Sequence, residues 1–293
     1  MKKRIFNIVL SGFAAVLLIT IGGASTLRAN TTTTAVTTAT DSTTTTTSDF
    51  NTSSDQDYFN YSYSGTAAVY SSTAGLGSTG GFSISSEFDQ NSIWTSKTAL
   101  SNAKGTTFSI SGAFYNSTGN AGFGLLGFSS TDTNSTDSTY PAVVSNSIEV
   151  AFHGGGVMLY SDGSLLSSWN WDLSSTASGQ SNGDLAADTW FNVTLTLTLN
   201  ASNNYDVSFA IYDLSGTLLV SETYNNVVST ALSSTSSIYG YVGASASRVT
   251  EIDDVTESVT TVDLVPEPST YASLLIGGIA AFGMIRRGKE ARV

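Results

Sequence analysis

The chain has 293 residues, a formal net charge of −12 and only 12% charged residues, about half the usual fraction. Lys97, Lys104 and Arg248 are the only basic residues between positions 29 and 285. The body is therefore strongly acidic and repels nucleic-acid phosphates, so we expect no nucleic-acid partner. The chain has no cysteine, which excludes disulfides, thiol nucleophiles and zinc–thiolate sites.

Residues 1–29 have the three parts of a secretory signal peptide. Basic residues at 2–4 precede an apolar stretch at 5–23, and small residues then offer cleavage after Ala24 or Ala29. A retained membrane anchor is the alternative, because the apolar stretch is long. Both interpretations predict export of the chain that follows.

Residues 30–54 are dominated by threonine and contain almost no apolar side chains. Such a segment cannot offset its ordering entropy by burial. We therefore expect a disordered Thr/Ser-rich linker, either bare or O-glycosylated.

Residues 55–262 show apolar and polar side chains in alternation, the pattern of strands with one face on a core. The strand at 190–199 is the clearest, and the turns after it predict a meander with strands at 205–211 and 217–223. Further strands are predicted at 82–88, 106–114, 122–128, 147–152, 156–160, 238–243 and 249–259. This pattern predicts an all-β domain, an antiparallel β-sandwich of jelly-roll type.

The order of these segments resembles the laminin-G/concanavalin-like lectin and glucanase superfamily. The segments are a Gly-rich stretch at 119–128, Ile-Glu-Val-Ala-Phe at 148–152, the Trp-led strand at 190–199 and Glu-Ile-Asp-Asp-Val at 251–255. The resemblance implies a concanavalin-like sandwich whose last strand returns beside the first. It also implies that the concave face or the rim loops often bind carbohydrate, although a fold does not by itself define a function.

The sequence offers few catalytic candidates. Glu251, Asp253 and Glu257 occupy alternate positions, as residues on one face of a strand do, with Val255 between them. Their spacing departs from the glucanase motif of the superfamily, so we interpret them as solvated acids on an edge or rim strand. The single histidine, His153, precedes three glycines, and we interpret these glycines as a turn between strands. We predict a protein that is not an enzyme; the alternative is a surface glycan hydrolase or lyase with a degenerate active site.

Two segments are candidates for ligand binding. Trp169 and Trp171 share a face if their segment is extended, so they are candidate carbohydrate-binding residues; the alternative is a pair of core or rim tryptophans. Asp132, Asn134 and Asp137 offer oxygen ligands at the short spacing that calcium sites use, although a chain this rich in such residues forms similar loops by composition alone. We expect no other cofactor.

Residues 263–293 contain Pro266-Glu267-Pro268, an apolar run at 271–285 and a basic tail with Arg286 and Arg287. The run predicts a short transmembrane helix and the tail stops transfer. The order of the three parts resembles the PEP-CTERM sorting signal of Gram-negative bacteria; an ordinary tail anchor is the alternative. The resemblance implies that an exosortase, a membrane-embedded cysteine transpeptidase, recognises Pro266, Glu267 and Pro268 and passes the protein to the cell surface or exopolysaccharide matrix.

Together these features predict an exported, surface-targeted, non-catalytic protein of the cell envelope or exopolysaccharide matrix. Its expected partners are the secretion machinery, an exosortase, the membrane through its C-terminal helix before processing, and an exopolysaccharide or other glycan.

Overall fold

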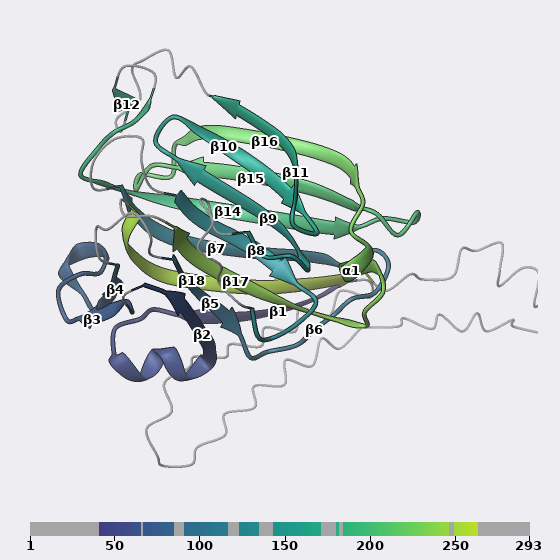
Figure 1. Ribbon diagram of the computed structural model, residues 1–293, viewed down its shortest axis with the longest axis horizontal. Helices are drawn as coiled ribbons and strands as arrows, with labels where there is room; N and C mark the ends of the chain where they lie inside the picture. Colours follow the sequence, from purple (N-terminus) through teal and green to yellow (C-terminus); the bar gives the residue numbers. More distant parts are fainter. Residues whose placement is uncertain are drawn as a thin grey trace, which may run out of the picture.

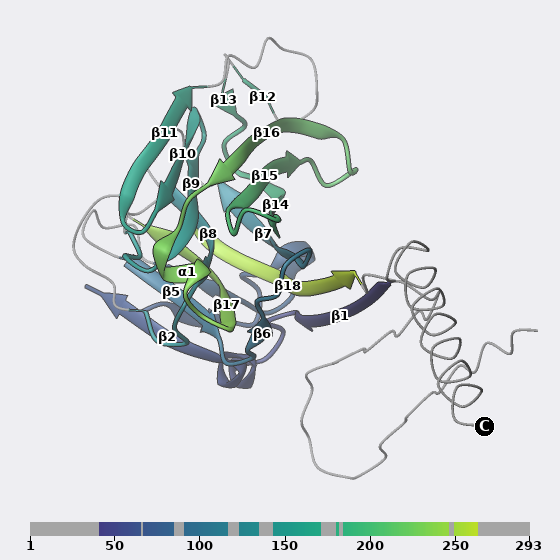
Figure 2. The ribbon, with the colours of Figure 1, turned by 90° about the vertical axis from the view of Figure 1, so that its right-hand side faces the viewer.

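The structure, a computed structural model, describes residues 41–65, 67–84, 91–116, 123–134, 143–170, 180–181, 184–245 and 249–262. The predicted signal peptide (1–29) and sorting segment (263–293) lie outside these residues. The described chain forms two eight-stranded sheets that pack face to face (Figures 1 and 2). The predicted antiparallel β-sandwich is therefore confirmed.

The first sheet, sheet A, contains the predicted meander at one side and the last strand near the other. Its order is β16 (Leu218–Val227), β15 (Tyr205–Tyr212), β14 (Thr189–Leu199), β7 (Thr107–Asn116), β18 (Val249–Val262), β4 (Gly81–Ser83) and β3 (Val69–Ser71), and β1 (Asp41–Ser48) also pairs with β18.

The second sheet, sheet B, is built mainly from the middle of the chain, with two early strands at one side and a late strand inside it. Its order is β11 (Ser164–Asn170), β10 (Gly156–Ser161), β9 (Ser147–His153), β8 (Phe123–Ser129), β17 (Ser237–Ser245), β5 (Asn91–Ser96) and β2 (Phe59–Ser64), and β6 (Leu100–Ser101) also pairs with β17. The remaining elements are β12 (Gln180–Ser181), β13 (Asp184–Leu185), η1 (Ser53–Tyr58), η2 (Leu76–Ser78) and α1 (Thr230–Ser233).

Alternating strands supply most of the core between the sheets. On β14, Phe191, Val193 and Leu195 are buried while the threonines between them face outward. The Phe152 ring of sheet B meets both Phe114 and Phe209 of sheet A, at centroid distances of 5.0 and 5.8 Å. Each such side chain contributes about 1.5–3 kcal/mol by leaving water, so the period-two pattern accounts for the sandwich.

Several strands were not predicted, and β5 shows why. All six residues of β5 are buried, because it lies inside sheet B with side chains covering both of its faces. A strand buried on both faces has no reason to alternate. The predicted strand at 82–88 is confirmed only for its start in β4, since residues 85–90 lie outside the described part.

The predicted disordered linker is wrong for residues 41–54. β1 pairs with β18 along its whole length, from Asp41 opposite Val262 to Ser48 opposite Val255 (Figure 2). Phe50 follows and is fully buried against Phe59, Phe82 and Trp94. Threonine favours strands, and β18 offers an edge where a Thr-rich segment can pair. The domain therefore includes at least residues 41–54, and the last strand lies beside the first, as the superfamily resemblance implied.

A β-bulge divides β18 into two halves. Asp253 lies opposite Ala113 and Thr256 opposite Ser111, so three steps along β18 match two along β7. Asp254 takes up the extra residue with a φ of 50°, a backbone region that Asp tolerates better than most residues. The bulge reverses the alternation, so Val255 and Glu257 point inward where an uninterrupted strand would place them outward.

Candidate functional site

The centre of the outer face of sheet B is filled by the protein's own side chains. Ile93, Leu125, Ala151 and Tyr241 form a second buried cluster, which Val144 covers from the segment before β9. Tyr241 lies over Gly127, where a Cβ would meet its ring. The centre of this face therefore offers no open surface to a ligand.

A buried tyrosine–carboxylate pair lies within this filled face. The Tyr241 hydroxyl donates to Glu149 Oε2 at 2.7 Å and lies 3.0 Å from Ser147 Oγ. Burial, and next the nearby Glu149 carboxylate, raise the pKa of Tyr241 well above its ordinary value. Both residues are fully buried, so their role is structural.

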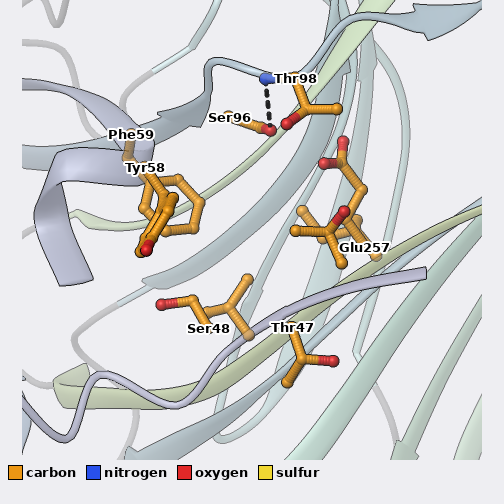
Figure 3. A pocket seen from close by; sticks show the side chains of 10 residues that line it. Thr47, Ser48, Tyr58, Phe59, Ser96, Thr98 and Glu257 are labelled. Atoms are coloured by element: carbon orange, nitrogen blue, oxygen red, sulfur yellow. Dashed lines mark hydrogen bonds between the residues drawn. The ribbon is translucent and has the colours of Figure 1, made fainter. Parts of the chain in front are cut away.

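A cavity of about 80 Å³ opens between β1, the start of β2 and the inner face of β18. Its polar lining comes from three directions (Figure 3). Glu257 points toward Ser96 and Thr98, Ser48 comes from β1, and the rings of Tyr58 and Phe59 close another side. Since a water molecule takes up about 30 Å³ in the liquid, the cavity has room for a few waters or a small chemical group.

Glu257 is the acidic residue that lines this cavity. Its carboxyl accepts hydrogen bonds from the Gly240 N–H, at 2.8 Å, and from the Ser96 hydroxyl. Burial outweighs these bonds and raises the pKa of Glu257 to about 7. Gly240 permits this approach, because a Cβ there would collide with the carboxyl.

Ser48 adds an unusual polar group to the same cavity. It is only 7% exposed, and its Oγ has no hydrogen-bond partner among the described residues. A buried unpaired hydroxyl costs about 1–3 kcal/mol, so a bound water or small polar group at this position would relieve that cost.

An aromatic pair lies on the outer face of sheet A, where β7 ends and β14 begins. Trp190 and Tyr115 are cross-strand neighbours with ring centroids 5.5 Å apart. Glu251 is the next residue in the same row, opposite Tyr115 on β18. Burial, followed by the charges of Asp188 and Glu251, raises the pKa of Tyr115. The site thus combines two partly exposed rings with two nearby carboxylates.

The prediction that Glu251, Asp253 and Glu257 share one face as solvated acids is wrong. The bulge leaves Glu251 and Asp253 on the outer face and turns Glu257 inward. Asp253 is only 1% exposed, and it accepts bonds from the Leu76 N–H and the Thr79 hydroxyl. Burial raises the pKa of Asp253 to about 6. Its role is to fix the 75–79 segment on sheet A.

The prediction that the glycines after His153 form a turn between strands is confirmed. His153 ends β9, Gly156 begins β10, and the two strands pair as a hairpin. The His153 Nδ1 accepts a hydrogen bond from the Gly155 N–H at 3.0 Å.

The sequence-predicted sugar site is described only in part. Trp169 stands near the end of β11, with its backbone opposite Val157 of β10, and Trp171 lies outside the described residues. Trp190 and Tyr115 were not among the residues predicted from the sequence to bind a ligand. Trp190 opens the predicted strand at 190–199, and the register of β14 on β7 is what brings the two rings together.

The predicted calcium loop is also described in part. Asn134 is buried; its side chain donates to Thr95 Oγ1 and accepts from Ser129 Oγ, both at 2.8 Å. Asp132 accepts a bond from Asn60 through its main-chain oxygen, and Asp137 lies outside the described part. Within the ranges that the structure describes, no three His, Cys, Asp or Glu side chains group around a metal position, and no helix there is long and apolar enough to span a membrane.

Comparisons with known proteins identify the fold. No family model matches the sequence, and no curated protein matches it. A structure of peanut lectin with a nine-residue peptide matches with a TM-score of 0.52 and 10% identity, over 76% of this chain and 99% of the lectin.

Other plant proteins match with lower scores. Winged bean acidic lectin in complex with methyl-α-D-galactose gives a TM-score of 0.49 at 9% identity, over 75% of this chain and 99% of that one. Arcelin-5, a lectin-like defence protein from Phaseolus vulgaris, gives 0.47 at 14% identity, over 77% and 99%. The likeness to peanut lectin shows that the chain has the concanavalin-like sandwich fold.

The buried carboxyl groups make the stability of the protein dependent on pH. The pKa of Glu257, about 7 in the folded state, lies above its ordinary value of 4.5, so the folded protein holds this proton more tightly than the unfolded chain. The resulting stabilisation is present below the ordinary pKa and is lost as pH rises through 7. We expect thermal unfolding to occur at a lower temperature at pH 8 than at pH 5, a loss of up to about 3 kcal/mol from Glu257.

The difference in unfolding temperature between pH 5 and pH 8 should be smaller in the Glu257→Gln variant. Thermal unfolding followed by circular dichroism measures this difference. Asp253, with its pKa of about 6, should leave a smaller pH dependence of stability in the same direction. Asp57→Asn, at an exposed position beside the cavity, is the control. An unchanged pH dependence in Glu257→Gln would contradict the assignment.

Proposed function

We propose that this protein is an exported, non-catalytic, glycan-binding protein of the cell surface or exopolysaccharide matrix. The observation that carries the proposal is the pair of rings, Trp190 and Tyr115, beside Glu251 and Asp188 on the outer face of sheet A. The concanavalin-like fold, which the chain shares with peanut lectin, supports it.

The chemistry of this pair suits a sugar. The CH faces of a pyranose ring are apolar and stack on aromatic rings, while its hydroxyls donate to carboxylates. Trp190 and Tyr115 are inclined to each other by 54°, so the two rings form an angled platform. Glu251 lies beside Tyr115 in register and can accept from a sugar hydroxyl.

The proposal assigns no catalytic step. Glycoside hydrolysis uses two carboxyl groups on either side of the scissile bond, whereas Glu257 is the one acidic residue lining the 80 Å³ cavity. The proposal likewise requires no cofactor.

The alternative, a glycan hydrolase or lyase, has one observation in its favour. Glu257 has a pKa near 7 beside a cavity, as a general acid would. Hydrolysis of a neutral polysaccharide that is lost in Glu257→Gln would establish the alternative.

Export and anchoring rest on the ends of the chain. In the proposal, residues 1–29 direct export through the inner membrane of a Gram-negative bacterium, and the segment 263–293 holds the protein in the membrane at least transiently. An exosortase then acts near Pro266, Glu267 and Pro268.

Loss of the indole should weaken glycan binding. We expect Trp190→Ala to reduce affinity for the best ligand from a glycan array by about tenfold, which corresponds to ~1.4 kcal/mol, because the stacking surface is removed. Isothermal titration calorimetry measures the change. Tyr63→Ala is the matched control, since Tyr63 is half exposed on β2 of the other sheet. Wild-type affinity in Trp190→Ala would exclude this site.

Processing at the C-terminus has its own test. We expect the mature protein from its native host to end near residues 266–268, as measured by intact mass and C-terminal peptide mapping. Survival of the apolar run and of Arg286 and Arg287 in the mature chain would show a plain membrane anchor.

A further inference from the structure

The outer face of sheet A carries an array of hydroxyl groups, which we call the hydroxyl lattice. Its middle row crosses six paired strands, and every position in it is serine or threonine. The row consists of Thr45, Ser258, Ser109, Thr196, Ser208 and Thr223. On β1, β18, β7 and β14, the residues two positions before and two positions after the middle-row residue are also Ser or Thr.

The lattice is regular because the sheet is. Neighbouring strands lie about 4.8 Å apart, and same-face residues along a strand about 7 Å apart. Adjacent hydroxyls bond to each other across strands, as in Thr43 with Thr260 at 2.9 Å and Thr107 with Thr198 at 3.1 Å. These bonds hold short side chains in place, so a ligand that binds the lattice orders little that is not already ordered.

The lattice is neutral although the protein carries a net charge of −12. Solvent-facing sheet surfaces usually include charged side chains, which also prevent association between sheets. Asp206 lies at the margin of the lattice, two positions before Ser208, where it accepts bonds from the Asn226 N–H at 2.9 Å and from the Asn200 amide at 3.3 Å. The neutral surface is therefore a local property of this face.

The Thr-rich first strand extends this surface. β1 places Thr43, Thr45 and Thr47 on the lattice, and turns Thr46 and Ser48 toward the Glu257 cavity. The bulge in β18 places Thr256, Ser258 and Thr260 outward beside them.

The chemistry of the lattice selects one class of partner. Each Ser or Thr hydroxyl donates and accepts, as sugar hydroxyls do. Anionic polymers are repelled by the net charge. Protein interfaces rely on aromatic and Arg anchors, which the lattice lacks.

We propose that the hydroxyl lattice is a docking surface for a neutral, hydroxyl-rich polysaccharide, whose repeated hydroxyls bond to successive rows. This inference rests on the proposed glycan-binding function and extends it from the Trp190–Tyr115 pair to the face beside it. Many weak contacts on a polymer add up through multivalency.

The test measures retention of the purified full-length protein on cellulose and chitin, which are neutral, and on alginate, which is anionic. We expect retention on a neutral polymer and not on alginate. Thr196→Glu, which places a charge in the middle row, should lower the partition coefficient about tenfold or more. Thr196→Val keeps the shape and removes one hydroxyl, and should cause a smaller loss. Ser168→Glu, exposed on β11 of sheet B, should bind as the wild type, and circular dichroism checks the fold of each variant.

Three outcomes would overturn the inference. If Thr196→Glu binds the polymer as the wild type while Trp190→Ala does not, the lattice is excluded and the proposed function stands. If the wild type binds soluble glycans and neither neutral polymer, the lattice is also excluded and the proposed function stands. If it binds no glycan but shapes growing ice crystals, the lattice orders water instead, and both proposals fail.

Discussion

The bulge at Asp253 and Asp254 is the constraint on which the arrangement of sheet A depends. Before it, Ile252 faces the core and Glu251 faces outward; after it, Val255 and Glu257 face inward. An uninterrupted strand would bury Thr256, Ser258 and Thr260 and expose Val255 and Val259. One inserted residue thus supports the core, the Glu257 cavity and the outward row of hydroxyls.

The same strand organises the outer face into two regions. Beyond the bulge, β18 carries the hydroxyl lattice with β1 on its edge. Before the bulge, Glu251 joins Tyr115 and Trp190, and buried Asp253 fixes the 75–79 segment between the two regions. The outer face of sheet B differs, because Val144 and Tyr241 help to fill it with apolar side chains. The aromatic pair and the hydroxyl lattice therefore both lie on the outer face of sheet A.

The fold was predictable from the sequence where one face of a strand meets water. β14 and β15 alternate cleanly, whereas β5 is buried on both faces and shows no alternation. β1 was missed because its inward positions are also polar: Thr46 and Ser48 line a cavity instead of packing in the core. The candidate site was largely unpredictable, since Trp190 and Tyr115 lie 75 positions apart and meet only through strand register. The acidic residues of β18 were assigned to the wrong faces, because counting alternate positions along the sequence does not reveal a bulge.

The central claim is that ligands bind on the outer face of sheet A, and NMR shift mapping tests it most directly. Backbone amide spectra would be recorded while a soluble neutral oligosaccharide is added to the full-length protein. We expect the largest shifts at Tyr115, Trp190 and the middle row around Thr196. Shifts confined to the Glu257 cavity, or to sheet B strands such as β10 and β11, would contradict it.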